Sequence, residues 1–308
     1  MAEEVMSTIA LVIPYYNRRA LLERTLESIA LAKEQPTQIL LVDNASTDGS
    51  ASVCRQWAQE HPLLKVELLE ESMPGASAAR NRGLAAVESE WVFFFDSDDE
   101  LDADFFADIR PMLNDDWDML AVPTRMFLKN RSQIRKYKVS SDPVAQIFYS
   151  HLNTQGMIFR TSFLRKIGGW NIHALVWNDW ELGLRALLHR PRFRWISERP
   201  YHRIHVHDDS ITGNSYAQKG EERLQTLRIA AHTCMGGKRL LAAIYLRHAM
   251  LEGRFMAESA FALALKCRKQ AEELSLKANF LLRFKMRLIR WLTSNNIPGI
   301  WLLAYWLV

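Results

Sequence analysis

The segment WVFFFDSDDELD, residues 91–102, joins an aromatic, apolar run to a dense group of acids. The run WVFFFD (91–96) has the composition of a buried strand. The acids within and after it are Asp96, Asp98, Asp99, Glu100 and Asp102. Carboxylates packed this tightly repel one another unless a cation lies among them. The segment therefore predicts a buried strand that carries a cation site at its end.

The residues before this segment alternate between apolar and helix-forming stretches. Strands are predicted at 9–16, 38–43, 64–70 and 91–96, and helices at 18–32, 48–61 and 75–89. This alternation is typical of βαβ units and of a parallel sheet covered on both faces. Ligands bind beyond the carboxyl ends of such strands. The polar segments PYYN (14–17), VDNASTDGS (42–50) and DSDDE (96–100) should therefore share one edge.

The pattern is weaker beyond residue 105. We expect one or two strands within 117–128, a strand, a short helix and a Gly-Gly turn within 154–171, a helix at 177–189 and a strand at 193–196. From about residue 216 onward the composition favours helix. The sequence thus predicts an α/β domain with a mostly parallel central sheet over residues 1–215 and a C-terminal helical region over residues 216–308.

Charge and cysteine content bear on location. From Asn214 onward the chain has 15 Lys and Arg against 6 Asp and Glu, and the net charge of +4 less this +9 leaves −5 on residues 1–213. Cys54, Cys234 and Cys267 form no metal-binding or redox spacing, which indicates buried thiols in a reducing compartment. The N-terminus lacks the basic segment of a secretory signal. We therefore expect a cytoplasmic protein.

The basic tail has the pattern of a membrane-surface segment. FLLRFKMRLIRW (280–291) has apolar residues at helical spacing with basic residues between them, and IWLLAYWLV (300–308) carries no charge. Both are shorter than the about 20 residues that span a bilayer. We expect a peripheral contact with anionic lipid at the inner face of the cell membrane. Packing of this tail on the catalytic domain is the alternative.

The acidic cluster suits Mg²⁺ or Mn²⁺, which one or two carboxylates and substrate phosphates often hold. An acidic helix start is the alternative. An EF-hand is excluded, because Leu101 and Ala107 occupy the positions of its Gly and its last Glu. A P-loop is excluded because the sequence contains no GxxxxGK[ST] segment.

Six segments, taken together, resemble the family 2 glycosyltransferases. They are TIALVIPYYNRRALLERTLESI (8–29), ILLVDNASTDGS (39–50), GASAARNRGLAAVESEWVFFFDSDDEL (75–101), FLRKIGGW (163–170), NDWELGLRAL (178–187) and HVHDDSIT (205–212). Each is weak alone, but their order and spacing over residues 8–213 are those of the family. The resemblance implies a GT-A fold and an inverting transfer that depends on a nucleotide-diphospho-sugar and a metal.

The resemblance also implies roles for the donor-site residues. Pro14, Tyr15, Asn17 and Asp43 would form the wall that receives the nucleotide base. Arg80 would reach the base or the diphosphate.

The remaining implied roles concern metal and catalysis. Asp96 would lie near the ribose and Asp98 on the metal, with Asp99 adjacent. Asp179 would be the catalytic base, and the late histidine His207 would contact the metal or the diphosphate.

The sequence departs from the family pattern at three places. Asn178 stands where the family has the Glu of a Glu-Asp pair, strand two ends in VDNAST, and His205 replaces an Arg two positions before His207. The metal contact therefore stays open between His205 and His207.

Several structural alternatives stay open as well. NDWE resembles a capping box with Asn178 as N-cap, and Glu181 and Arg185 can pair at i,i+4, so Asp179 could serve the helix alone. We expect His202, His205 and His207 to share a strand face, with a zinc site as an alternative. Trp170 and Trp177 could stack on a sugar or pack internally.

The function expected from these patterns is transfer of a sugar to the hydroxyl of a saccharide or lipid-linked saccharide, in bacterial surface polysaccharide or glycolipid synthesis. No nucleic-acid partner is expected. One alternative is an inactive nucleotide-sugar-binding or scaffold module. Another is a related nucleotidyltransferase, but PYYNRRA (14–20) lacks the Gly-rich loop that this would need.

Overall fold

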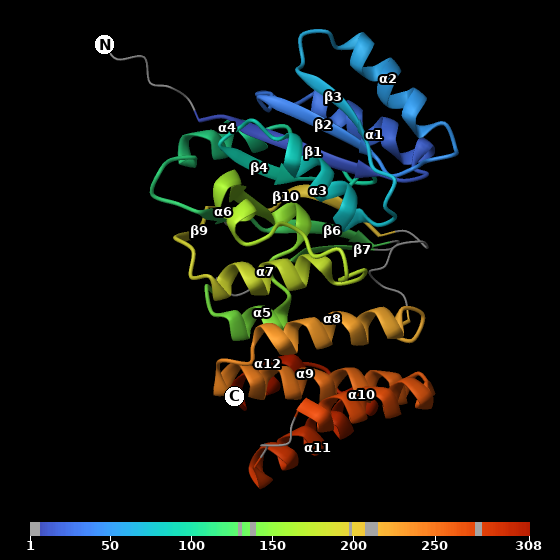
Figure 1. The fold of residues 1–308 in the computed structure, drawn as a ribbon, viewed down its shortest axis with the longest axis vertical. Coiled ribbons are helices and arrows are strands. Elements are labelled where there is room, and N and C mark those ends of the chain that lie inside the picture. Colours follow the sequence, from blue (N-terminus) through green and yellow to red (C-terminus); the bar gives the residue numbers. More distant parts are fainter. Residues whose placement is uncertain (1–6, 129–130, 136–139, 197–198, 207–214, 275–278) are drawn as a thin grey trace. The chain divides into compact units, whose positions relative to one another are not determined.

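The computed structural model describes residues 7–128, 131–135, 140–196, 199–206, 215–274 and 279–308 (Figure 1). The chain divides into two compact units. The sheet unit comprises residues 1–139, 152–172 and 189–207, and the helical unit comprises residues 140–151, 173–188 and 208–308. Residues 140–151 and 173–188 thus join the C-terminal helices, although we expected them before a boundary at residue 215.

The sheet unit is built on a seven-stranded sheet in the order β3-β2-β1-β4-β8-β5-β9. The pairs β3–β2, β2–β1, β1–β4 and β5–β9 are parallel, whereas β8 runs antiparallel to β4 and β5, which confirms a mostly parallel sheet. The strands are β1 Ile9–Tyr15, β2 Gln38–Asp43, β3 Val66–Glu70, β4 Trp91–Phe94, β5 Met119–Ala121, β8 Met157–Arg160 and β9 Phe193–Trp195.

A second sheet in this unit has the order β10-β6-β7. It comprises β6 Thr124–Leu128, β7 Arg131–Arg135 and β10 Tyr201–His205. The stretch 117–128 therefore forms two strands, β5 and β6, separated by Val122 and Pro123. Pro123 has no N–H to donate to a strand partner, which favours a break there.

Helices cover both faces of the large sheet. They are α1 Arg19–Ala30, α2 Ser50–Glu60, α3 Ala76–Ala86, α4 Phe105–Ile109 and α6 Thr161–Lys166, with 3₁₀ turns at Arg110–Met112 and Thr154–Gly156. Side chains alternate along β1, so Ile9, Leu11 and Ile13 join a core with α1, α2 and α4. Val12 points to the other face, toward α3. A Cβ on Gly83 of α3 would lie 2.4 Å from Val12 Cγ1, so only glycine allows this close approach.

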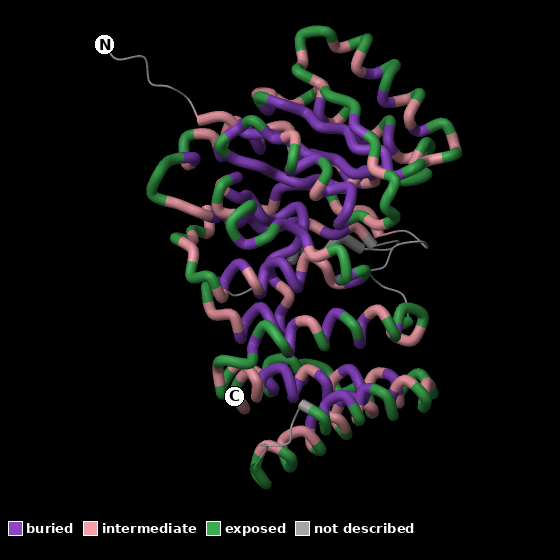
Figure 2. Tube along the Cα trace, in the orientation of Figure 1, coloured by how far each residue is buried: buried purple, intermediate pink, exposed green. Residues whose placement is uncertain are grey.

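The aromatic run of β4 lies in the middle of this core. Trp91, Phe93 and Phe95 are fully buried, and the Phe93 ring lies 4.6 Å from the Phe105 ring of α4. Figure 2 shows the central strands β1, β2 and β4 buried, whereas the edge strand β3 and much of α2 are exposed. The predicted buried strand that ends in acids is therefore confirmed.

The helical unit is arranged around one long helix. Its helices are α5 Pro143–Tyr149, α7 Asn178–Leu188, α8 Gly220–Thr233, α9 Lys238–Ala257, α10 Phe261–Leu274, α11 Phe280–Ser294 and α12 Ile300–Trp306. Helix α9 contacts α5, α8, α10, α11 and α12. Within the described ranges, no helix combines the length and the apolar character needed to cross a lipid bilayer.

Candidate active site

The polar segments after β1 and β2 meet at one edge of the sheet, as predicted. Tyr15 and Asp43 are paired neighbours at the ends of these parallel strands. The loops beyond them are joined, because the Thr47 N–H donates to Asn17 Oδ1 at 2.8 Å and the Asn17 N–H donates to Ser46 Oγ at 3.1 Å. Asn17 has a left-handed backbone with φ 48°, which asparagine tolerates better than most residues.

The wall predicted for the base is largely buried. Tyr15 continues the inward alternation of β1 and is 4% exposed, and its burial beside Cys54 and Asp43 raises the pKa of its phenol. Asp43 accepts a hydrogen bond from the Ser46 N–H at 2.9 Å, which holds the turn after β2. The next residue, Tyr16, is 57% exposed. Tyr16 therefore exposes an aromatic ring near this edge. It was not predicted from the sequence, although strand alternation could have identified it.

The buried Arg80 forms an ion pair with Asp96, whose side chain is 32% exposed. Arg80 Nη2 donates to Asp96 Oδ1 at 2.7 Å, and the guanidinium lies 4.3 Å from the ring of Trp170. Trp170 is only 2% exposed, so it packs inside and cannot offer a face to a sugar. Gln155 Nε2 donates both to Asp96 Oδ2, at 2.7 Å, and to Asp99 Oδ2. Gln155 was not predicted, since no local pattern marks it.

Asp99 is directed into the protein. It is 2% exposed, and Oδ1 accepts from the His205 N–H at 2.8 Å while Oδ2 accepts from Gln155. Burial, with Asp98 and Asp96 nearby, raises the pKa of Asp99 well above its usual range. Both oxygens thus accept hydrogen bonds within the protein, and the metal contact expected of Asp99 stays a prediction.

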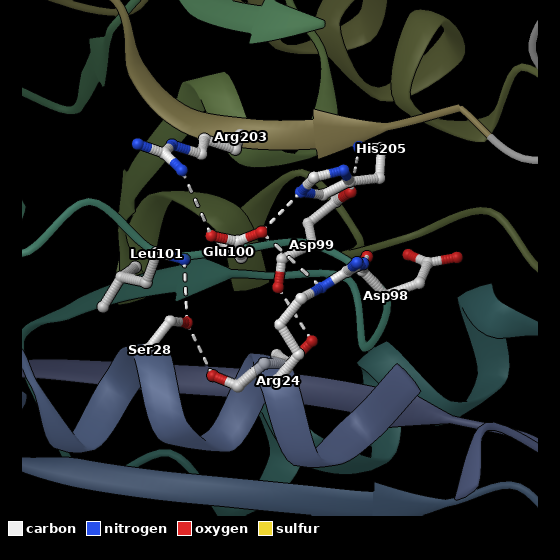
Figure 3. Close-up of polar contacts among 9 residues, drawn as sticks. Arg24, Ser28, Asp98, Asp99, Glu100, Leu101, Arg203 and His205 are labelled. Carbon is white, nitrogen blue, oxygen red and sulfur yellow. Dashed lines mark hydrogen bonds and ion pairs between the residues drawn. The ribbon is translucent and has the colours of Figure 1, made fainter. Parts of the chain in front are cut away.

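Asp98 stands nearer the surface. Its side chain is 19% exposed, with Oδ2 3.6 Å from Arg18 Nη2. Its carbonyl oxygen accepts from Arg24 Nη2 at 2.5 Å, and the carbonyl of the next residue accepts from Thr25 Oγ1 at 2.8 Å. Helix α1 therefore fixes the backbone of the acidic loop, as Figure 3 shows for Arg24.

His202 and His205 lie in different surroundings. A bulge between Tyr201 and Arg203 gives His202 a φ of 53° and turns it into the aromatic core, where burial lowers its pKa to about 3. His205 instead pairs with Glu100 at 2.7 Å, beside Arg203 (Figure 3). The expectation that the histidines share a face is therefore wrong for His202, and His207 lies outside the described residues.

The fit to a metal can be tested on these side chains. In the portions of the chain that are described, no group of three or more His, Cys, Asp or Glu could hold a metal ion. A divalent cation that takes one carboxylate from the protein and the rest of its oxygens from a diphosphate and water needs no such group. The partly exposed carboxylate of Asp98 fits that requirement.

Asp179 belongs to the helical unit, at the start of α7. Helix α7 begins at Asn178, so Asn178 is helical and is not the cap. Asp179 Oδ1 accepts a hydrogen bond from the Trp180 N–H at 2.7 Å, which restricts the direction of the carboxylate. Glu181 is buried and makes the predicted pair with Arg185, at 2.8 Å and 2.9 Å. Trp177 precedes the helix with a left-handed φ of 55°.

Curated proteins with similar sequences include glycosyltransferases. The uncharacterized glycosyltransferase YibD of Escherichia coli is 31% identical over 112 residues, 36% of this chain and 32% of that protein. The GalNAc(5)-diNAcBac-PP-undecaprenol beta-1,3-glucosyltransferase of Campylobacter jejuni is 30% identical over 96 residues, 31% of each chain. The chain thus aligns with about a third of the length of these curated relatives.

A solved structure shares the fold over nearly the whole chain. S. aureus TarS 1–349 in complex with UDP-GlcNAc has a TM-score of 0.70 and 18% identity, and covers 95% of this chain and 92% of that one. The GT-A-type architecture is therefore confirmed. The family model for glycosyl transferase family 2 matches residues 10–168, which is more than half of the 308 residues. This match contains the acidic loop and its supporting helices, and the chain belongs to glycosyl transferase family 2.

Proposed function

We propose that this chain is a metal-dependent, inverting glycosyltransferase that moves a sugar from a nucleotide-diphospho-sugar to an acceptor hydroxyl. The observation that carries the proposal is the convergence of Asp43, the Arg80–Asp96 pair and Asp98 at the carboxyl edge of one parallel sheet. Ligands of open parallel sheets bind at this edge. The UDP-GlcNAc complex of TarS supports a nucleotide sugar as the donor.

The donor side needs charge neutralisation and orientation. Asp98 would hold Mg²⁺ or Mn²⁺, which supplies Lewis-acid stabilisation of the leaving diphosphate when bound. Asp96 is oriented by Arg80 and Gln155, so its carboxylate is already directed to accept a hydrogen bond from a ribose hydroxyl. Asp99, with both oxygens engaged, positions the loop through its bond to the His205 N–H.

The acceptor side needs a base. Asp179 accepts the proton of the acceptor hydroxyl, and its bond from the Trp180 N–H favours the ionised carboxylate. A single displacement assisted by this base inverts the configuration at the anomeric carbon. No covalent nucleophile is required.

Replacing Asp98 by Asn should remove Mn²⁺-dependent donor binding, because the amide offers a neutral oxygen where an anionic ligand is needed. Isothermal titration of UDP and of candidate nucleotide sugars, with and without Mn²⁺, measures this loss. Asp116→Asn, an exposed acid of the same unit, is the matched control and should leave binding unchanged. Donor affinity in Mn²⁺ that equals the wild-type value would refute the role of Asp98.

We further propose that the chain works on a lipid-linked saccharide at the inner face of the bacterial cell membrane, in surface polysaccharide or glycolipid synthesis. The undecaprenol-linked acceptor in the name of the Campylobacter relative supports this acceptor class. Helix α11 packs on α9 through Ile289 and Thr293 but leaves Phe280, Phe284 and Trp291 exposed at i, i+4 and i+11. Trp301 and Trp306 of α12 are exposed as well.

The exposed apolar stripe of α11, with basic residues beside it, should bind anionic vesicles. The triple variant Phe280→Ser, Phe284→Ser, Trp291→Ser should lose most co-sedimentation with phosphatidylglycerol liposomes, since these rings supply the apolar contact. Binding by the wild type should weaken at high salt. Leu63→Ser, at a 98% exposed site of the sheet unit, is the control. Equal sedimentation of the triple variant and the wild type would exclude this stripe as the anchor.

A further inference from the structure

The helical unit contains a cluster of arginines stacked on aromatic rings, which we call the arginine–aromatic cluster. Its members are Arg223 of α8, Arg247 and Arg254 of α9, Trp177, Trp180 and Tyr216. The Trp177 ring lies 5.0 Å from the guanidinium carbon of Arg247 and 5.7 Å from that of Arg223. Tyr216 lies 5.1 Å from Arg223 and 5.8 Å from Arg254. Three cations thus share two neighbouring rings.

The central cation of this cluster has no ionic partner among the described residues. Arg247 makes no hydrogen bond or ion pair with any of them, and its Nε is fully buried. Its contacts are the faces of Trp177 and Trp180, at 5.0 Å and 5.9 Å. A cation over an aromatic face is attracted by the ring, but this contact leaves the buried Nε–H of Arg247 without a hydrogen-bond acceptor.

The neighbouring cations are only partly satisfied. Arg223 is 3% exposed and donates to the Tyr216 carbonyl at 2.7 Å, but its Nε has no hydrogen-bond partner. Arg254 donates to Asn296 Oδ1 at 2.9 Å, which is neutral. Burial lowers the pKa of Arg223 and of Arg247, and the charge of Arg254 lowers that of Arg247 further. Each guanidinium therefore favours an added anion.

Two carboxylates of the described residues act on Arg223 of the cluster, Glu258 and, more weakly, Glu222. Glu258 accepts from Ser215 Oγ and from the N–H groups of Tyr216 and Ala217, at 2.6 Å to 2.9 Å. Three guanidinium groups less these two carboxylates leave a formal charge of +1. The cluster therefore keeps an excess of positive charge, and a phosphomonoester or a diphosphate suits it because guanidinium forks bind phosphate oxygens in pairs.

We infer that the arginine–aromatic cluster binds a phosphate group of the acceptor, with Arg247 as its principal contact. This inference rests on the proposed function, because Trp177 lies two residues before the proposed base Asp179. The Trp177 ring is the one that the guanidinium groups of Arg223 and Arg247 contact. A phosphate held by these arginines would position the acceptor hydroxyl at the carboxylate. The phosphate comes either from a lipid diphosphate or from a soluble sugar phosphate.

The first test is direct binding of inorganic phosphate and pyrophosphate to the full chain by isothermal titration calorimetry. The titration contains no divalent metal, so that the proposed donor site does not contribute. Arg247→Gln should weaken binding by at least about tenfold, because it removes the charge and the fork. Arg247→Lys should bind with intermediate affinity, since it keeps the charge alone.

The matched control is Arg228→Gln, an exposed arginine of the same helix as Arg223. It should bind pyrophosphate like the wild type, and thermal unfolding confirms that all variants are folded. Equal pyrophosphate affinity in Arg247→Gln and Arg228→Gln, or no binding by the wild type, would overturn the inference. If Arg247→Gln does not fold, Arg247→Lys takes its place in this comparison. Pyrophosphate affinity in Arg247→Lys equal to that in Arg228→Gln would then overturn the inference.

The source of the phosphate is tested by comparing polyprenyl diphosphate in detergent micelles with a soluble sugar phosphate. The ligand whose affinity for the protein falls in Arg247→Gln is the source of the phosphate. Donor binding to the Mn²⁺-loaded protein should be unchanged in this variant. Arg247-dependent phosphate binding without sugar transfer would contradict the proposed function and leave the phosphate site standing.

Discussion

Replacing Asp179 by Asn is expected to lower the turnover number by about 10²-fold or more while donor affinity stays near the wild-type value. Asn cannot accept the proton of the acceptor hydroxyl, so the loss falls on the chemical step. The shape of the side chain and the bond from the Trp180 N–H, at 2.7 Å, can both be kept. Turnover with saturating donor and acceptor, together with calorimetric donor affinity, measures the effect.

The control for this substitution is Glu273→Gln, which neutralises an exposed acid of the helical unit. It should leave turnover and donor affinity unchanged. The pH dependence adds a second readout, since the acidic limb of the wild-type turnover profile should vanish in Asp179→Asn if that limb reports the base. Turnover retained within about threefold would mean that the base lies elsewhere and that Asp179 serves α7 alone.

Replacing Phe93 by Ala is expected to reduce the free energy of unfolding of the sheet unit by about 3–5 kcal/mol. Phe93 is fully buried and packs against Phe95, Phe105 and His202, with ring centroids 6.0, 4.6 and 5.3 Å away. These neighbours come from the residue that follows β4, from α4 and from β10, so the cavity left by Ala cannot be closed by a shift of one element. Urea unfolding followed by circular dichroism measures the change.

Leu63→Ala provides the comparison, because Leu63 is 98% exposed and its truncation removes no core contact. Its effect should stay within about 0.5 kcal/mol. A change below about 1 kcal/mol for Phe93→Ala would contradict the view that the aromatic strand is the buried support of the acidic loop.

Local periodicity was sufficient to predict the first four strands of the sheet unit and the three helices between them. The strands at β1, β2, β3 and β4 and the helices between them follow from runs of apolar residues with period two or near 3.6. Parallel strands place their carboxyl ends together, so the shared edge of Tyr15 and Asp43 followed from the same pattern. The family resemblance likewise depended on short segments in order, and the family match over residues 10–168 confirmed it.

Contacts between distant segments were not predictable in this way. Gln155 joins Asp96 and Asp99 across 59 and 56 positions, and nothing near it in the sequence marks it as their partner. The bulge that turns His202 into the core arises where β10 pairs with β6. No sequence pattern within residues 201–207 indicates this bulge. The same limit applies to Trp170, whose burial depends on Arg80, Asn81 and Phe94.

The sequence by itself determined the parallel α/β architecture, the position of the acids at a strand end and the family, because each of these is expressed within windows of a few to thirty residues. Only the tertiary structure decided which acids face outward. Asp98 and Asp99 are adjacent, yet one is partly exposed and the other is 2% exposed beneath β10. The physical reason is that burial and hydrogen-bond partners are set by segments that meet only after the chain has folded.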